Sequence, residues 1–583
     1  METKISNVIN KIKTNKVYST VSGILFPIVL TALCFVNVNK GIDITDSAYS
    51  CSNFVSLDRL DGMWFVSTFY ANLLGKLITV LPGGMTLLGM NIWTSVVKVF
   101  ILLGAYFFFS FKTNVGKEKA FIGEFVAGCL FWCPSTILYN NLTYLLFFAG
   151  AACLWSGIKE DRPWRFVLAG FLLGSNIFVR FPNVCEAALI LVVWYDAFLK
   201  RAKAAEWLKK TGLCMAGYFG SFIPAFILAS VTVGVKAYFT GISELFVMTG
   251  DATDYSAFGM IINLAKSYVH AWTWLEPTIL FLLLVLLGCL VFPSKLNAVR
   301  YAVSAAIAVF LLGFLYKKAL FSFDYHSYGA VYGIGKLVLC LAVIMFLLVL
   351  AVPKESRENK MLSLASLVII AVTPLGSNNE VYANLNNLFW VIPVFLMILL
   401  RFTNVNEYFR GVRLAVFILF AGFAFQSILF GFTFRFRDGM QAPMDTKVAG
   451  NAVLNGMYTT QNNAKDLEEL TALWNENNLS EGEVLLFGDV SGLAFYMGTP
   501  VAISTAWPSL DSFSTDKYTS QMVGLEKKIE NKECEKPAVI VGAENTEQSK
   551  TYYAKKEILN EFLEKYHYKP LYSNERFSLL IAE

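Results

Sequence analysis

The sequence predicts an all-α polytopic membrane bundle followed by a smaller α/β domain. Of the 583 residues, 56% are hydrophobic and only 16% are charged, whereas soluble chains carry about 25% charged residues. One soluble core could not bury so much apolar surface, so lipid must solvate most of it. The same composition excludes a disordered chain, a collagen-like repeat and a disulfide scaffold.

The chain begins with an amphipathic segment and then a first span. Residues 1–16 place Ile5, Ile9 and Ile12 on one helical face among lysines, which predicts a short helix lying on the inner leaflet. Residues 17–38 form an apolar stretch of about 20 residues, long enough to cross a bilayer. No cleavage pattern follows it, so we expect a retained helix with a cytoplasmic N-terminus.

The apolar stretches that follow bring the prediction to about thirteen transmembrane helices. They cover residues 87–111, 121–133, 137–155, 166–181, 187–198, 212–235, 278–292, 302–315, 333–352, 361–375, 388–400 and 414–432. Alternate links are basic, as the positive-inside rule requires of cytoplasmic links, and contain Lys112, Lys117 and Lys119; Lys159, Arg162 and Arg165; Lys200, Arg201, Lys203, Lys209 and Lys210; Lys295 and Arg300; Lys354, Arg357 and Lys360; Arg401, Arg410 and Arg413. The exception is Lys317-Lys318, in an outer link.

Two regions are expected from this pattern. Residues 1–434 form the transmembrane domain, with a long first outer loop at 39–82 whose amphipathic section 63–78 should lie in the outer interface. An odd number of spans places residues 435–583 outside the cytoplasm. There, short apolar runs at 484–489, 538–542 and 577–582 alternate with helical patterns near 466–477, 518–529 and 551–566. This alternation is typical of a small α/β domain.

Several function classes are excluded by missing motifs. The chain has no G-x-x-x-x-G-K-[ST], H-E-x-x-H or G-x-S-x-G string, and its external domain has no G-x-G-x-x-G string. It is therefore no ATP-driven pump, zincin or α/β-hydrolase by its own motifs. Three His cannot build a His-rich metal site, and the ten Cys follow no metal-binding spacing. We therefore assign no metal ligands.

The informative string is Gly41-Ile-Asp43-Ile-Thr-Asp46-Ser-Ala-Tyr49, directly after the first span on the outer side. A carboxylate at the lipid boundary is costly unless it caps a helix or faces water or protein. In one interpretation Asp46 caps the following helix. In the other it is a general base for an acceptor hydroxyl. Local residues alone leave both open.

Three strings resemble the GT-C superfamily of membrane glycosyltransferases, in particular bacterial proteins akin to protein O-mannosyltransferases and aminoarabinose transferases. Asp46-Ser-Ala-Tyr49 is similar to their Asp-Glu-x-Tyr-like string in the first outer loop, with Ser47 replacing the usual acid. Residues 172–182, ending in Arg180-Phe-Pro182, resemble their fifth-helix pattern. Residues 487–500 are similar to the strand and turn that open some of their external domains.

The resemblance implies an inverting transfer of a sugar from a polyprenyl-phosphate donor to an extracytoplasmic acceptor hydroxyl of a glycan, lipid or protein. Asp46 would be the base, Asp43 its partner or a metal ligand, and Arg180 the clamp on the donor phosphate, with a snorkelling anchor as the other interpretation of Arg180. Tyr49 and two residues of the polar loop 377–387, Glu380 and Asn384, would bind substrate, unless that loop is merely solvated. A divalent cation is left open as a cofactor, and no nucleic acid partner is expected.

Two other functions compete with this one. A transporter or flippase of lipid-linked sugars would show repeated halves with broken helices at mid-membrane, and no such repeat is seen. A non-catalytic GT-C-fold envelope protein would fit the replacement by Ser47. The polar residues Lys98, Glu124, Glu186 and Lys336 lie in or near spans, and we expect them to form structural pairs inside the bundle of a bacterial plasma-membrane protein.

Overall fold

In a computed structural model of the chain, the structure describes residues 16–131, 135–251, 257–292, 296–402, 409–438, 443–544 and 548–583. The predicted interfacial helix over residues 1–16 lies outside them, except for its last residue. The bundle helices are α2 (Lys16–Cys34), α6 (Leu87–Phe111), α7 (Lys117–Leu130), α8 (Tyr139–Glu160), α9 (Pro163–Ile177), η1 (Phe181–Leu189), α10 (Ile190–Lys200), α11 (Ala204–Gly220), α12 (Phe222–Thr232), α13 (Val235–Asp251), α14 (Ala257–Val291), α15 (Asn297–Lys317), α16 (Tyr332–Ala351), α17 (Arg357–Val372), η5 (Glu380–Asn386), α18 (Val391–Phe402) and α19 (Phe409–Thr433).

The polytopic bundle is confirmed, but the predicted count of about thirteen spans is not. Within the described residues, nine helices are long and apolar enough to cross a membrane, or ten if η5 and α18, bent by 87°, form one span. The predicted spans at α7, α9 and α17 coincide with helices of only 14, 15 and 16 residues. At about 1.5 Å per residue, such helices rise less than the roughly 30 Å of the hydrocarbon core.

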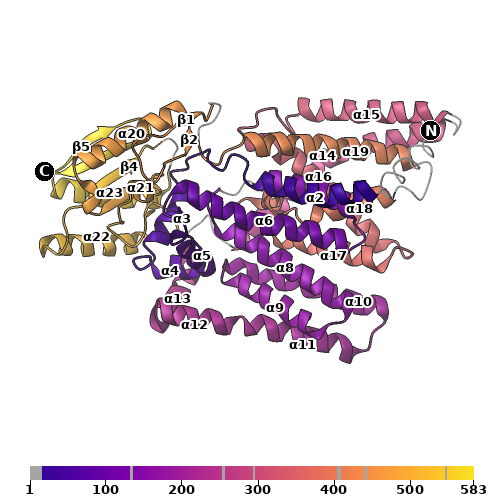
Figure 1. Cartoon of the computed structure of the whole chain (residues 1–583), viewed down its shortest axis with the longest axis horizontal. Coiled ribbons are helices and arrows are strands. Elements are labelled where there is room, and N and C mark those ends of the chain that lie inside the picture. The colour runs from indigo at the N-terminus through magenta and orange to yellow at the C-terminus, as the bar shows by residue number, and fades with distance from the viewer. Residues whose placement is uncertain are drawn as a thin grey trace.

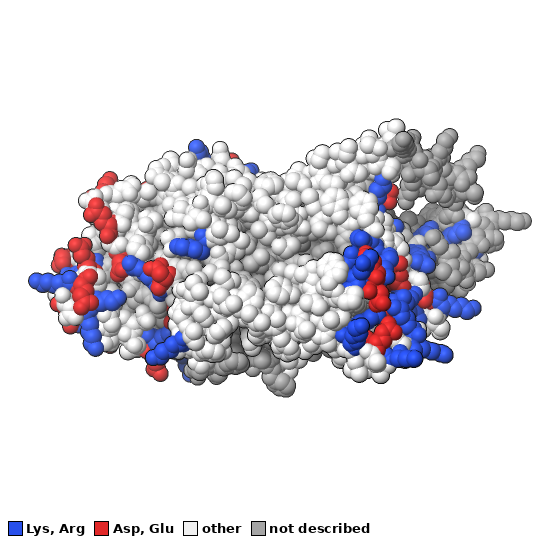
Figure 2. Space-filling model, turned by 60° about the horizontal axis from the view of Figure 1, so that its bottom comes forward, with Lys and Arg blue, Asp and Glu red and all other residues white. Residues whose placement is uncertain are grey.

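On the face shown in Figure 2, charged residues gather at the two ends of the molecule and are few between them. At the end away from the C-terminal domain, ion pairs join the ends of neighbouring helices. Glu160 at the end of α8 pairs with Lys112 after α6, at 3.2 Å, and with Arg165 in α9, at 2.6 Å. Arg357 in α17 pairs with Asp196 in α10. These are links that the sequence predicts to be basic and to share one side of the membrane.

Close helix packing in the bundle depends on small residues, as is common where lipid gives helices no hydrophobic reason to associate. A Cβ on Gly170 of α9 would lie 1.9 Å from the carbonyl oxygen of Cys214, and one on Gly217 of α11 would lie 1.9 Å from that of Val167. Any larger residue would separate these two helices. Glu124, Glu186 and Lys336 are buried as expected, but neither carboxylate oxygen of Glu124 has a hydrogen-bond partner among the described residues.

The predicted C-terminal α/β domain is confirmed. It contains β1 (Thr446–Lys447), β2 (Tyr458–Thr459), α20 (Gln461–Glu476), η6 (Leu479–Glu481), β3 (Val484–Phe487), α21 (Leu493–Met497), α22 (Thr515–Glu530), β4 (Ala538–Gly542), α23 (Lys550–Lys565), β5 (Tyr568–Ser573) and β6 (Phe577–Ala582). The main sheet has the order β3-β4-β6-β5, with β3 and β4 parallel and the other pairs antiparallel. All four residues of β3 are buried, as a strand covered on both faces requires. The sequence did not predict β5.

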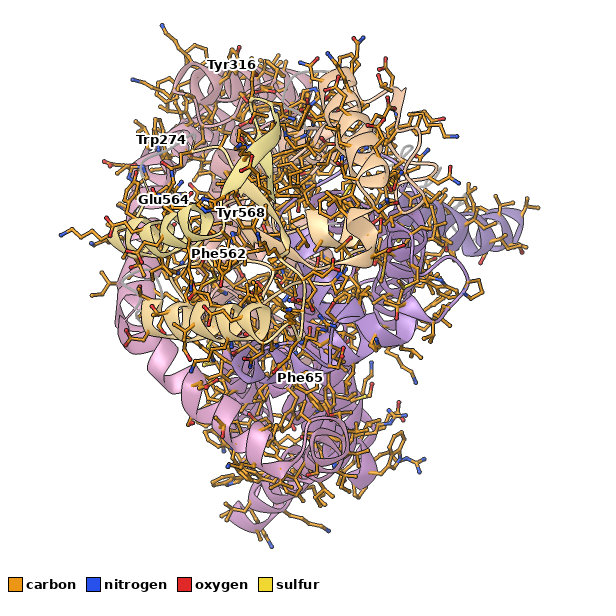
Figure 3. The ribbon with its side chains drawn as sticks, turned by 90° about the vertical axis from the view of Figure 1, so that its left-hand side faces the viewer. Phe65, Trp274, Tyr316, Phe562, Glu564 and Tyr568 are labelled. Carbon is orange, nitrogen blue, oxygen red and sulfur yellow. The ribbon has the colours of Figure 1, made fainter. Side chains whose placement is uncertain are left out.

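The domain sits at one end of the bundle, and short helices of the first outer loop lie between the two (Figure 1). These helices are α3 (Asp46–Val55), α4 (Gly62–Ser67) and α5 (Phe69–Thr79). Viewed from the side of the domain, Phe562, Glu564 and Tyr568 lie between Tyr316 of α15 above and Phe65 of α4 below (Figure 3). The helices of the first outer loop therefore lie where bundle and domain meet.

Candidate functional site

The carboxylate of Asp43, and not that of Asp46, caps the first helix of the outer loop. Asp43 is 4% exposed. Its Oδ1 accepts from the backbone N–H of Thr45 at 2.8 Å and from the Thr45 hydroxyl, and its Oδ2 accepts from the N–H of Ser47 at 2.8 Å and the Ser47 hydroxyl at 2.9 Å. The interpretation of Asp46 as the cap is therefore wrong. Ser47, which departs from the GT-C pattern, is a donor in the cap, where an acidic side chain would place a second carboxylate against Asp43.

Asp46 is the first residue of α3, and its carboxylate takes no part in the cap. Its side chain is 35% exposed, and Oδ2 lies 2.9 Å from Nη1 of Arg437. Burial raises the pKa of Asp46 to about 6; Arg437 opposes the rise, and the negative charges of Asp43 and Asp489 add to it. A carboxylate with such a pKa is mostly ionised at neutral pH yet binds a proton more strongly than an ordinary aspartate, which suits a general base.

The linker of residues 434–438, between α19 and the domain, is a part of the site that the sequence analysis missed. Arg437 donates from Nη1 to the hydroxyl of Thr45 at 3.1 Å as well as pairing with Asp46. The buried carboxylate of Asp438 accepts from the N–H of Ile42 at 2.6 Å and from side chains of the domain. The only sequence signal was the dense charge of Arg435-Phe-Arg437-Asp438, directly after the last span.

The domain contacts the same segment through residues 487–500, which the sequence analysis had singled out. The hydroxyl of Tyr496 donates to the carbonyl oxygen of Asp43 at 2.6 Å, and the N–H of Gly492 donates to that of Ile44 at 2.7 Å. A Cβ on Gly492 would lie 2.3 Å from the Cβ of Ala48, so only glycine permits this approach. The ring of Trp507 packs edge-on against Tyr49, 5.6 Å between centroids.

Beneath α3 is a cavity of about 110 Å³, bounded by α2, α6, α7, α19, the start of the outer loop and Tyr496. Asp43 and Ser47 line it together with three basic residues, Lys40, Lys98 and Arg435. Burial lowers the pKa of Arg435 to about 10.

Three buried polar atoms among the cavity's residues, Asn91 Oδ1, Thr136 Oγ1 and Arg435 Nε, have no hydrogen-bond partner in the part of the chain that the structure describes. Since an unpaired buried polar group costs about 1–3 kcal/mol, these atoms mark the cavity as a place for a polar ligand.

The remaining predicted site residues lie elsewhere. Arg180 donates to the carbonyl oxygen of Gly376 and stacks over Tyr139, 5.4 Å from the ring centroid. It lines a second pocket of about 10 Å³ with the buried Glu186. Glu380 and Asn384 belong to η5, and neither lines the basic cavity or the pocket of Arg180. The structure therefore brings Asp43, Asp46 and Tyr49 together, and places Arg180 in a different pocket from the basic cavity.

The described residues contain no group of three or more His, Cys, Asp or Glu arranged to hold a metal ion. Both oxygens of Asp43 already accept hydrogen bonds, so this carboxylate is poorly placed to be the metal ligand that the resemblance allows. A divalent cation as cofactor stays a prediction.

No family model and no curated protein matches the chain. Among solved structures it is similar to ArnT, an aminoarabinose transferase from Cupriavidus metallidurans, bound to undecaprenyl phosphate, with 12% identity, a TM-score of 0.41 and coverage of 96% of this chain and 97% of that one. For the apo state of ArnT, the identity is 13%, the TM-score is 0.43, and the match covers 96% of this chain and 98% of that one. An oligosaccharyltransferase from Archaeoglobus fulgidus, in complex with Zn and sulfate, has 10% identity and a TM-score of 0.46, covering 89% of this chain and 68% of that one.

Proposed function

We propose that the protein is a membrane glycosyltransferase of GT-C type, which moves a sugar from a polyprenyl-phosphate donor to an acceptor hydroxyl outside the cytoplasm. The observation that carries the proposal is that Asp43 and Asp46 have different surroundings. Both oxygens of Asp43 accept hydrogen bonds in the cap, whereas among the described residues only Oδ2 of Asp46 has a partner, and the pKa of Asp46 is about 6. Asp43, three residues before Asp46, lines a cavity together with three basic residues.

The cavity supports a phosphorylated donor. Lys98 and Arg435 supply positive charge, and the unpaired Arg435 Nε and Thr136 hydroxyl are donors of the kind that phosphate oxygens accept. Asn91 Oδ1 is an acceptor, which matches a sugar hydroxyl. A cavity of about 110 Å³ suits a head group only, so the polyprenyl chain would leave between helices into lipid.

The chain's own residues supply a base and two cations for the proposed reaction. The acceptor O–H gives its proton to the Asp46 carboxylate while the acceptor oxygen attacks C1 of the sugar. The C1–O bond to phosphate breaks, and its electron pair leaves with the polyprenyl phosphate. Lys98 and Arg435 stabilise the charge that grows on the phosphate. Attack from the side opposite the phosphate inverts the anomeric centre.

Labelled donor and purified full-length protein in membranes test this function. Lys98→Met should raise the KM for donor about tenfold or more, since a buried charge contact to phosphate is lost. Lys317→Met is the matched control, because Lys317 is exposed and outside the cavity, and it should behave as the parent. Arg180→Met tests the predicted clamp in parallel.

Two outcomes would replace the proposal. Movement of lipid-linked sugar across proteoliposome membranes without transfer would identify a flippase. Donor binding with neither transfer nor movement would identify a non-catalytic envelope protein.

A further inference from the structure

Arg437 reaches the proposed base from the linker of residues 434–438, and no other cation is paired with Asp46 among the described residues. We infer that Arg437 is a positioning residue: it holds Oδ2 of Asp46 so that Oδ1 faces the acceptor hydroxyl, and it makes this geometry depend on the docking of the C-terminal domain. The inference rests on the proposed function.

The guanidinium contacts two consecutive residues at the start of α3. Nη1 lies 3.1 Å from the hydroxyl oxygen of Thr45 and 2.9 Å from Oδ2 of Asp46. The Thr45 hydroxyl in turn donates to Asp43. Arg437 is thus connected to both aspartates, to one directly and to the other through Thr45. Both contacts are made by the same nitrogen, Nη1, so a single side-chain atom joins the two residues.

The backbone of the linker is fixed on both sides of Arg437. Before it, Nη2 of Arg435 donates to the carbonyl oxygen of Phe432 at 3.0 Å. After it, Asp438 accepts from Ile42 in the outer loop and from Thr459 and Asn463 in the domain. Arg437 itself has a φ of 49°, a left-handed conformation that costs a non-glycine residue about 1 kcal/mol or more and persists only where neighbours impose it. The linker therefore delivers this side chain to Asp46 only while the domain is docked.

Three charges face Asp46: Asp43 from its own segment, Asp489 from the loop after β3, and Arg437 from the linker. Without Arg437 the two negative charges remain, so the pKa of Asp46 must rise. Because a base works in its ionised form, the acid limb of the pH–rate profile would then move to higher pH. For a pair that is half exposed, about half a pH unit is expected.

The experiment compares Arg437→Gln and Arg437→Lys with Arg59→Gln in the full-length protein. Arg59 is the matched control, because it is equally exposed and also joins the outer loop to the domain, through Glu483, without touching Asp46. Arg437→Gln should move the acid limb of the kcat/KM profile to higher pH and lower kcat about tenfold. Arg437→Lys should return the acid limb to the pH of the parent but restore kcat only in part. Arg59→Gln should keep the parent pH profile and kcat. An unchanged acid limb in Arg437→Gln would overturn the inference.

A second readout does not depend on catalysis. Carbodiimide labels protonated carboxyl groups, so the pH midpoint of Asp46 labelling, followed by mass spectrometry, should also rise in Arg437→Gln but not in Arg59→Gln. If the protein transfers no sugar while this midpoint still moves, the proposed function fails and the pairing of Arg437 with Asp46 survives. If transfer is normal and neither the midpoint nor the acid limb moves, the inference fails alone.

Discussion

Replacing Asp43 should lower the free energy of unfolding, whereas replacing Asp46 should lower the rate of sugar transfer. In Asp43→Ala, the cap of α3 is lost, which costs about 1 kcal/mol. The N–H and hydroxyl groups of Thr45 and Ser47 lose their shared acceptor in a buried place, which adds about 1–3 kcal/mol. We expect a total loss of about 2–3 kcal/mol, since the two contributions overlap.

Asp46→Asn, by contrast, removes one partly exposed ion pair and should change the free energy of unfolding by no more than about 1 kcal/mol. Thermal unfolding of the detergent-purified full-length proteins measures the first effect, and transfer of labelled sugar from a polyprenyl-phosphate donor measures the second. Asp43→Asn is the informative intermediate, because its amide keeps one acceptor oxygen while losing the charge.

The expected order is therefore opposite in the two assays. Asp43→Ala should unfold at the lowest temperature, and Asp43→Asn should retain a measurable fraction of the parent rate when assayed well below its unfolding temperature. If Asp43→Asn were as stable as the parent but lost as much transfer as Asp46→Asn, then Asp43 would act in the reaction and the assignment of its role as a cap would be refuted.

Three further predictions concern the site and its orientation. Because the pKa of Asp46 is about 6 and the ionised form is the base, kcat/KM should fall tenfold per pH unit below pH 6 and level off above it; a flat profile down to pH 5 would exclude this base. Gly492→Ala should force the domain away from α3, where a Cβ would meet Ala48 at 2.3 Å, and reduce transfer about tenfold, while Gly524→Ala, in open space on α22, should do nothing. Cys534, half-buried in the domain, should react with a membrane-impermeant maleimide in intact cells, and labelling only after permeabilisation would invert the proposed topology.

The helices could be predicted because hydropathy is a local property. Each apolar stretch coincides with a helix or with two consecutive helices, and the strand at 538–542 has the predicted bounds. What hydropathy could not predict is how far each helix extends across the membrane. α9 ends at Ile177, and η1 begins at Phe181 after a turn that contains Arg180, so the predicted span at 166–181 extends beyond the end of its helix.

The site was only half predictable because its other half comes from far along the chain. The string from Gly41 to Tyr49 contains two aspartates. Which of them caps α3 depends on where the side chains of Thr45 and Ser47 lie in the folded structure. Arg437 and Tyr496 lie almost 400 residues or more from the aspartates they contact, and no periodicity connects them. Arg180 was chosen for its position at a helix end, which does not specify the pocket that it faces.

The most direct measurement compares donor binding and turnover in Asp46→Asn. Binding of labelled polyprenyl-phosphate sugar to the full-length protein should match the parent, because the basic cavity is intact, while the single-turnover rate of transfer should fall at least about 100-fold, as expected when a general base is removed. Transfer at the parent rate by a correctly inserted Asp46→Asn protein would contradict the central claim that this carboxylate takes the proton of the acceptor.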